Sequence, residues 1–220
     1  RKAARLELAA AQRPFVTRQA GLKLSGSTRK KLRQDWNRLC TLGAVEVVNA
    51  RDAAAVGAAF EVFLELEANS WKGERGTALR SRAADAAFAR AWIGELAAHR
   101  SASVALLCLD GRPIAAQVLM YCGSMAYTWK IAFDGAFAKH SPGALLVDKV
   151  TEQLFAGDEC DAIDSCSIET GFMAKLWAGR RRMLDLLVDV SGRRSLGFRL
   201  VAARAHAYAR LRALRDRMNG

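Results

Sequence analysis

The segment Lys139–Ala144 brings a basic side chain, a histidine, a serine, a proline and a glycine together directly before an apolar, helix-like stretch. The first N–H groups of a helix lack partners inside it, and the positive end of the helix dipole lies there. A phosphate could therefore bind at this helix start, where Gly143 lets the backbone approach an anion closely. The alternative needs no ligand, because Ser141 can be an N-cap with Pro142 in the first helical position.

Carboxylates and a histidine stand where strands are expected to end. Glu169 follows the apolar segment Ala162–Cys166, and Asp134 follows Met125–Phe133. Such groups can take a proton from a reacting amine, and His140 could serve either as a base or as a phosphate contact. Each carboxylate could equally be a loop residue that caps a helix, and a histidine before a helix is more often a surface residue.

Three tryptophans adjoin polar segments and could offer flat faces to a substrate. Trp71 leads directly into Lys72-Gly73, Trp129 precedes Lys130, and Trp177 follows Lys175 by two residues. The alternative is that these tryptophans belong to the core, as most do. Lys130 could steer an anionic ligand or pair with a neighbouring carboxylate.

The elements that would position these residues follow from hydrophobic periodicity. After His99 the pattern changes from helical to strand-like, with the turns Asp110–Pro113 and Gly123-Ser124 separating three strands in an antiparallel meander. The third strand should alternate, with Met125, Tyr127, Trp129, Ile131 and Phe133 on one face. The remaining elements expected in this part are a helix from Pro142 to Phe155, a strand over Ala162–Cys166, a short helix with Lys175 and Trp177, and a strand over Met183–Val190.

The two ends of the chain are expected to be helical and basic. Residues 1–40 carry eleven basic and two acidic side chains, residues 179–220 carry eleven and three, and residues 41–178 have a net charge of −5. These ends could contact a polyanion, or they could be solvated helix faces. The helices predicted are Ser27–Leu42, Asp52 to Trp71, one containing Phe88, Trp92 and Leu96, and a C-terminal helix from Ser195 whose stripe is Val201, Ala205, Tyr208, Leu211, Leu214 and Met218. The predicted parts are thus a helical 1–100, a sheet-containing 101–190 and a helical 191–220.

Composition favours a folded intracellular protein. Of the 220 residues 51% are hydrophobic and only three are proline, and no stretch approaches the roughly 18–20 apolar residues of a transmembrane helix. Five cysteines form no CxxC pair, so we expect no metal site, and the strand-like surroundings of Cys108, Cys122, Cys160 and Cys166 predict buried thiols in a reducing, cytoplasmic location. The first residue is not methionine, which indicates part of a longer chain.

A meander that passes directly into a βαβ-like unit resembles the GNAT superfamily of acyltransferases. The local sequence motifs are similar to those of bacterial acetyltransferases associated with cellulose or exopolysaccharide biosynthesis, which are related to Fem-type peptidyl transferases. The residues that carry the resemblance are Ser70-Trp71-Lys72-Gly73, Asp110-Gly111-Arg112-Pro113-Ile114-Ala115-Ala116-Gln117, Phe137-Ala138-Lys139-His140-Ser141-Pro142-Gly143, and Lys175 with Trp177. Together they cover about residues 27–190.

The resemblance implies an α/β fold with a GNAT-like mixed sheet flanked by helices. It also implies transfer of an acyl group from acyl-CoA, such as acetyl-CoA, to an amine or hydroxyl of a small molecule, sugar or polysaccharide precursor. The CoA pyrophosphate would lie at the helix start before Gly143. The implied donor-binding residues are Lys139, Ser141, Gly143, Ala144 and Trp129; the catalytic candidates are Glu169, Asp134 and His140; and the acceptor-binding candidates are Trp71, Lys72, Lys130, Lys175 and Trp177.

The helix start departs from the superfamily's usual pattern. That pattern has a basic or amide residue, two variable residues, glycine, a variable residue, and glycine or alanine, whereas this chain has His140, Gly143 and Leu145. Two alternatives therefore stay open. One is aminoacyl-tRNA in place of acyl-CoA, and the other is a non-catalytic nucleic-acid-binding module, against which the acidic middle of the chain argues.

Overall fold

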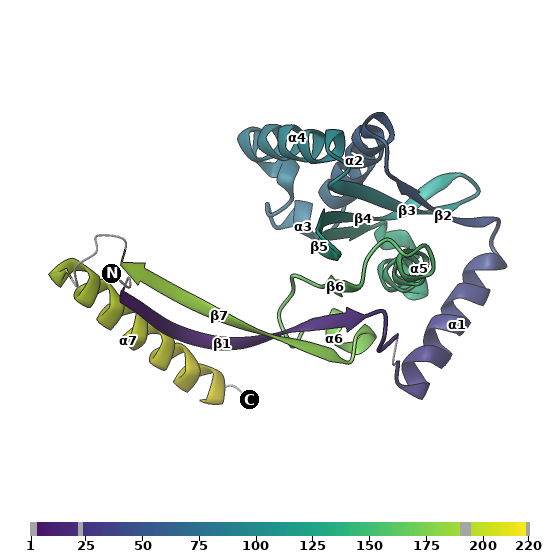
Figure 1. Cartoon of the computed structure of the whole chain (residues 1–220). Coiled ribbons are helices and arrows are strands. Elements are labelled where there is room, and N and C mark those ends of the chain that lie inside the picture. The colour runs from purple at the N-terminus through teal and green to yellow at the C-terminus, as the bar shows by residue number, and fades with distance from the viewer. Residues whose placement is uncertain (1–3, 22–23, 190–194, 219–220) are drawn as a thin grey trace. The chain divides into compact units, whose positions relative to one another are not determined.

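The computed structural model describes residues 4–21, 24–189 and 195–218, and it divides the chain into two compact units (Figure 1). One unit is formed by residues 14–180, and the other by residues 1–13 and 181–220. The strands occur in the order β2-β3-β4-β5-β6-β1-β7 in a seven-stranded mixed sheet. This architecture confirms the predicted α/β fold with a sheet flanked by helices.

The larger unit is built on an antiparallel meander, as predicted. Its three strands are β3 (Ala102–Leu109), β4 (Arg112–Cys122) and β5 (Met125–Phe133), with tight turns at Asp110-Gly111 and Gly123-Ser124. The strand β2 (Val45–Ala50), which precedes the helices α2 to α4, pairs antiparallel with β3 and extends the sheet. The short β6 (Ala162–Asp164) then pairs in parallel with β5, because α5 (Pro142–Ala156) returns the chain to the same end of the sheet. The last residues of β1 (Ala4–Thr17) pair antiparallel with β6.

Two hydrophobic clusters cover the two faces of this sheet. On one face α2 (Ala53–Ala68) and α4 (Ala83–Ala98) bury Phe60, Phe63 and Ile93 against Val104 and Val118. On the other face α1 (Gly26–Cys40) and α5 bury apolar side chains against β3 and β4 (Figure 1). Coverage on both faces explains why β3 and β4 are almost continuously apolar.

The strict alternation predicted for β5 is wrong. The register between β4 and β5 shifts at Val118/Leu119, where Val118 pairs with Lys130 but Leu119 pairs with Thr128. Trp129 is therefore the extra residue of a β-bulge. As a result Trp129 and its neighbour Lys130 both reach the α2–α4 face, where Trp129 packs edge-on against Trp92 and Lys130 contacts α2.

Short elements complete this unit. They are α3 (Trp71–Glu74), the 3-10 turns η1 (Leu79–Ser81) and η2 (Gly135–His140), and α6 (Met173–Leu176). Cys108 and Cys160 are buried as predicted, but Cys40, Cys122 and Cys166 are exposed. The prediction of buried thiols is thus wrong for Cys122 and Cys166, since both lie at the ends of apolar segments and not inside them.

The smaller unit contains the first part of β1, most of β7 (Gly179–Asp189) and α7 (Leu196–Met218). The strand β1 lies in the part of the chain, residues 1–100, that was predicted to be helical, so that prediction is wrong for Ala4–Thr17. In α7 the predicted apolar stripe is not a buried face, because Val201, Tyr208, Leu211 and Leu214 are all exposed. Val190, the predicted end of the last strand, lies outside the described residues. Within the described part of the chain, no helix is long and apolar enough to cross a membrane.

Candidate functional site

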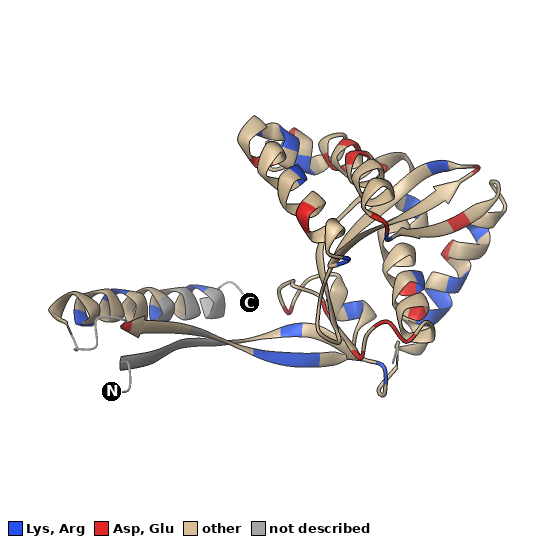
Figure 2. Cartoon of the chain, turned by 45° about the horizontal axis from the view of Figure 1, so that its top comes forward, with Lys and Arg blue, Asp and Glu red and all other residues tan. Residues whose placement is uncertain are grey.

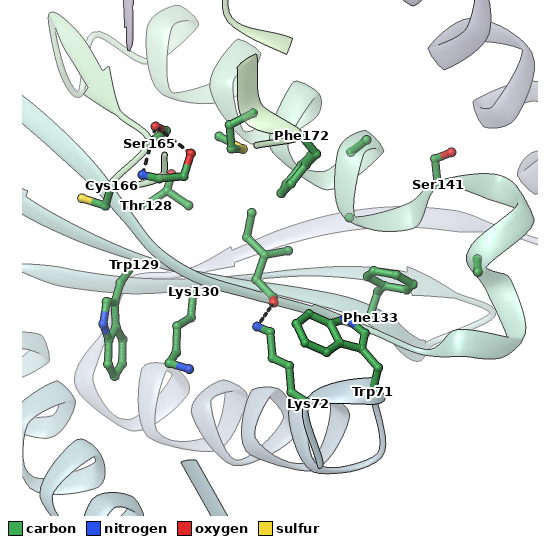
Figure 3. Close-up of a pocket in the computed structure, with 16 residues that line it drawn as sticks. Trp71, Lys72, Thr128, Trp129, Lys130, Phe133, Ser141, Ser165, Cys166 and Phe172 are labelled. Atoms are coloured by element: carbon green, nitrogen blue, oxygen red, sulfur yellow. Dashed lines mark hydrogen bonds between the residues drawn. The ribbon is translucent and has the colours of Figure 1, made fainter. Parts of the chain in front are cut away.

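A cavity of about 520 Å³ opens along the edge of β5 in the larger unit. Figure 3 shows Trp71, Lys72, Trp129 and Lys130 on one side of β5, and Ser165, Cys166 and Phe172 on the other. The volume falls within the range of small-molecule sites. The lining residues are Trp71, Lys72, Thr128, Trp129, Lys130, Ile131, Phe133, Ala138, Ser141, Gly143, Ala144, Ser165, Cys166, Ser167, Phe172 and Met173.

The cavity exists because β5 and β6 separate. Their parallel pairing covers only Met125–Tyr127 and Ala162–Asp164, after which the chain turns away from β5 at Ser165. Residues 128–133 of β5 therefore have β4 as a neighbour on one side and the cavity on the other. Backbone groups at this edge are therefore available to partners other than a neighbouring strand. The Ile131 carbonyl, for example, accepts a hydrogen bond from Lys72 Nζ at 2.9 Å.

A buried carboxylate lies behind this wall of the cavity. Glu67 on α2 is fully buried, and its Oε1 accepts hydrogen bonds from Lys130 Nζ at 2.7 Å and from Lys72 Nζ at 3.4 Å. Its Oε2 accepts the backbone N–H of Leu79 at 2.8 Å. Lys72 and Lys130, the two residues whose ammonium groups satisfy Glu67, both line the cavity, so the cluster borders the candidate binding surface.

Within this cluster, burial shifts the pKa of Lys72. Removal from water lowers the pKa of the Lys72 ammonium, and the positive charge of Lys130 lowers it further, while Glu67 opposes both effects. Lys72 keeps 22% of its side-chain surface exposed and is one of the residues that line the cavity. A ligand that brings negative charge would stabilise the ammonium form.

The sequence held a signal for Glu67 that was missed. The core face of α2 is read from Val56, Phe60, Phe63 and Leu64, and Glu67 continues the same spacing of three and four. A charged residue in an apolar stripe must be paired to be tolerated, and its partners come from α3 and from the β5 bulge. Because both partners are distant in sequence, the pairing itself could not be read from periodicity.

The start of α5 forms the far end of the cavity. Ser141 has a left-handed backbone with φ of 52°, and its carbonyl accepts the N–H groups of Ala144 and Leu145. As the ligand-free alternative expected, Ser141 occupies the N-cap position and Pro142 opens the helix. The Ser141 hydroxyl makes no capping hydrogen bond, however, and accepts one from Lys31 Nζ at 3.0 Å instead. Gly143 is buried at the cavity wall, where a Cβ would lie 3.4 Å from Phe133 Cδ1.

The other residues predicted for this helix start lie outside the lining. Lys139 is exposed on η2. His140 is buried, which corrects the expectation of a surface residue, and neither ring nitrogen has a hydrogen-bond partner. Of the predicted donor-binding residues, Ser141, Gly143, Ala144 and Trp129 line the cavity together.

The three catalytic candidates are not brought together in the cavity. Glu169 is exposed in the loop between β6 and α6, two residues after the lining residue Ser167. Asp134 accepts the N–H of Ala136 at 2.9 Å and pairs with Arg112 at 2.6 Å, so it caps η2 as the alternative interpretation expected. Catalytic roles for Glu169, Asp134 and His140 stay predictions.

The predicted acceptor-binding residues separate into two groups. Trp71, Lys72 and Lys130 line the cavity, and Trp71 is 51% exposed with Arg75 over its ring. Trp177 is only 1% exposed and packs in the core, so no ligand can stack on it, and a binding role for its ring is wrong. Lys175 is exposed on α6 outside the lining.

Several lining residues were not predicted. Thr128 belongs to β5, Ser165 and Ser167 follow β6, and Phe172 and Met173 lead into α6. Ser165 Oγ accepts the Ser167 N–H at 3.2 Å, which holds this loop in a turn. No local pattern marks these residues, because the divergence of β5 from β6 brings them together. Among the described residues, no group of three or more His, Cys, Asp or Glu side chains is placed to hold a metal ion.

Several solved structures have a fold similar to that of this chain. The chain resembles a conserved protein of unknown function from Bacteroides thetaiotaomicron, with a TM-score of 0.56 and 14% identity over 84% of this chain and 61% of that one. It also resembles the protein called L-PGS from Bacillus licheniformis, with a TM-score of 0.52 and 16% identity over 93% of this chain and 66% of that one. The C-terminal domain of a protein described as a lysylphosphatidylglycerol synthetase, from Agrobacterium fabrum, gives a TM-score of 0.52 and 18% identity over 74% of this chain and 47% of that one.

The chain thus spans less than two thirds of the length of each of these structures, and at such identities the likeness shows the fold alone. No curated protein matches the chain. The family model of the acetyltransferase (GNAT) domain matches residues 26–172, which include the whole meander, the start of α5 and most of the cavity lining. The chain belongs to the GNAT acetyltransferase domain family.

Proposed function

We propose that the chain transfers an acyl group from acyl-CoA, with acetyl-CoA as the first donor to test, to an amine or hydroxyl of a small molecule, sugar or polysaccharide precursor. The observation that carries the proposal is the cavity between the open edge of β5 and the start of α5. One end offers a helix N-terminus for phosphates, and the other offers aromatic and cationic side chains. A two-substrate transfer needs both ends.

The donor would lie along β5 with its phosphates at the start of α5. At that start Pro142 has no N–H, and Ala144 and Leu145 donate to Ser141, so the Gly143 N–H is the group left to bind an anion. Lys31 already reaches Ser141 from α1 and adds positive charge at this point, and Lys139 is close in sequence. Trp129 lines the cavity beside the β5 edge and could pack against the donor's arm.

The transfer itself exchanges one bond for another. The acceptor nitrogen or oxygen attacks the thioester carbonyl and forms the new bond, the carbon–sulfur bond breaks, and the proton lost by the acceptor balances the proton gained by the CoA thiolate. Backbone N–H groups at the open edge of β5 could hold the carbonyl oxygen while it carries negative charge. Among the described residues no Asp or Glu lines the cavity, so no lining carboxylate can act as the base. The candidate bases remain Glu169, Asp134 and His140, which lie outside the lining.

A thermal-shift comparison of acetyl-CoA, longer acyl-CoAs and tRNA tests the donor. A ligand that binds only the folded state raises the apparent melting temperature, so acetyl-CoA should raise it in a concentration-dependent way. A shift with tRNA alone would favour the aminoacyl-tRNA-dependent alternative, for which the basic face of α1 beside Ser141 is the supporting observation. No shift with any of these ligands would contradict acyl transfer from such donors.

A further inference from the structure

The cluster behind the β5 wall has an unbalanced charge. Glu67 contributes one negative charge, and Lys72 and Lys130 contribute one positive charge each, so their ammonium forms leave a net charge of +1. Among the described residues no carboxylate lines the cavity itself, so none there offsets this charge. An excess charge that borders a partly apolar cavity is costly unless a ligand or solvent compensates it.

The cluster also has hydrogen-bond donors to spare. A lysine ammonium has three N–H donors. Lys72 uses its donors on the Ile131 carbonyl and on Glu67, and Lys130 binds Glu67 and lies over the Trp129 ring at 5.9 Å. Both lysines contact the same atom, Glu67 Oε1, so their ammonium groups lie close enough together for one small anion to contact both.

We propose that Lys72 and Lys130 form a carboxylate-binding subsite, and that the acceptor of the proposed acyl transfer is therefore an amine or hydroxyl compound that carries a carboxylate. The identification of the ligand as the acyl acceptor rests on the proposed function, whereas the carboxylate-binding subsite rests on the cluster of Glu67, Lys72 and Lys130 alone. Glu67 is a positioning residue, since it holds both ammonium groups at the wall. Lys72 and Lys130 determine specificity.

The size of the excess charge favours a carboxylate over a phosphate monoester. One carboxylate neutralises a charge of +1, whereas a phosphate monoester brings about −1.5 to −2 near pH 7 and would leave negative charge beside Glu67. The walls next to the cluster are aromatic, with Trp71 at the mouth and Phe133 beyond Lys72 (Figure 3). Such walls cannot solvate a second charge but can pack on an apolar substituent of a monocarboxylate.

Isothermal titration of the whole chain with three matched probes tests the subsite without any donor. The probes are phenylacetate, its neutral analogue phenylacetamide, and benzylphosphonate, which share an aromatic ring and differ in charge. Hydrogen bonds to charged groups contribute about 1.5–3 kcal/mol. Phenylacetate should therefore bind at least about tenfold more tightly than phenylacetamide, and more tightly than benzylphosphonate.

Two variants assign the preference to the cluster. Lys130→Gln keeps a donor for Glu67 but removes the excess charge, so the preference for phenylacetate should fall to about equal binding of the acid and the amide. Lys130→Arg keeps the charge and should retain the preference. Lys30→Gln on the exposed face of α1 removes a lysine outside the cavity lining and should change nothing.

The outcomes separate this proposal from the proposed function. Equal binding of acid and amide to the unmodified chain, binding of neither, or a preference that survives in Lys130→Gln would overturn the carboxylate subsite. Titration of acetyl-CoA into the same proteins is the independent measurement of the donor. If acetyl-CoA binds and phenylacetate shows no preference, only the subsite fails; if the preference is present and acetyl-CoA does not bind, the proposed donor fails.

Discussion

At the scale of single residues, Glu67 is the most informative side chain of the larger unit. A fully buried carboxylate is tolerated because two ammonium groups and a backbone N–H satisfy it. With both lysines in the ammonium form, the formal charges of the cluster do not cancel, and both lysines belong to the cavity lining. A structural ion pair without a functional role would be expected to be neutral.

Removal of the Glu67 carboxylate should destabilise the fold. Glu67→Ala leaves Lys130 and Lys72 close together without their shared partner, and loss of one side of a buried pair costs about 3–5 kcal/mol in the free energy of unfolding. Urea unfolding measures this loss. Glu65→Ala, on the exposed face of the same helix, is the matched control and should stay within about 0.5 kcal/mol of the unmodified chain. Equal stability of the two variants would show that the cluster contributes no net stabilisation.

The candidate bases can be ranked by their surroundings. Asp134 is engaged with Ala136 and Arg112, and asparagine also caps helices well, so Asp134→Asn should keep most of the turnover. Glu169 is exposed near the cavity mouth, and if it takes the acceptor's proton, Glu169→Gln should reduce turnover by about 10²–10⁴-fold with unchanged donor affinity. Steady-state kinetics of both variants decides between them. Full turnover in Glu169→Gln, with loss in Asp134→Asn, would reverse the ranking.

At the scale of elements, the meander and α5 could be predicted because their signals are local. Asp110-Gly111 and Gly123-Ser124 mark the turns, and Pro142 marks the helix start. The strand β1 was missed because its pairing partner β6 lies more than 140 residues away. The bulge at Trp129 was missed because it depends on the β4 register, and without it Lys130 would not reach Glu67.

The helix α5 carries a pH-dependent destabilisation at Asp148. Burial, together with the nearby charge of Glu152 and against the opposing charge of Lys149, raises the pKa of Asp148 from 3.8 to about 6. The folded chain therefore holds this proton to a higher pH than the unfolded chain does. Consequently the contribution of Asp148 to the free energy of unfolding falls as the pH rises from 3.8 to about 6 and stays lost above that.

Asp148→Asn should remove this effect. At pH 7 the variant should be about 1 kcal/mol more stable, a value reduced for the partial solvent exposure of the carboxyl. Below about pH 3 the two proteins should be equally stable, since Asp148 is then protonated in both the folded and the unfolded state. Urea unfolding across this pH range measures the difference. A variant that is no more stable at pH 7, or equally stabilised at all pH values, would contradict the assignment to Asp148.

At the scale of the whole molecule, the excess of basic side chains lies at the two ends of the chain, whereas the residues that line the cavity lie between residues 71 and 173. The basic side chains gather at the two ends, and Figure 2 shows Lys and Arg recurring along α1. Because these arginines and lysines surround a helix and fix no register, binding to DNA or heparin should be weak in sequence preference and should decrease steeply with salt. Fluorescence anisotropy at increasing salt measures this. Sequence-selective DNA binding that survives high salt would instead favour a nucleic-acid-binding module.

Titration of acetyl-CoA into Gly143→Val shows whether acyl-CoA binds in the cavity between β5 and α5, as proposed. A Cβ at Gly143 meets Phe133 at 3.4 Å in ordinary contact, so the fold should tolerate the change, but the valine methyls would occupy cavity space. Gly94→Val on α4, where a Cβ meets open space, is the control. We predict that Gly143→Val weakens acetyl-CoA binding at least about tenfold, equivalent to about 1.4 kcal/mol, and that Gly94→Val leaves it unchanged. Unchanged affinity in a folded Gly143→Val protein would contradict the claim.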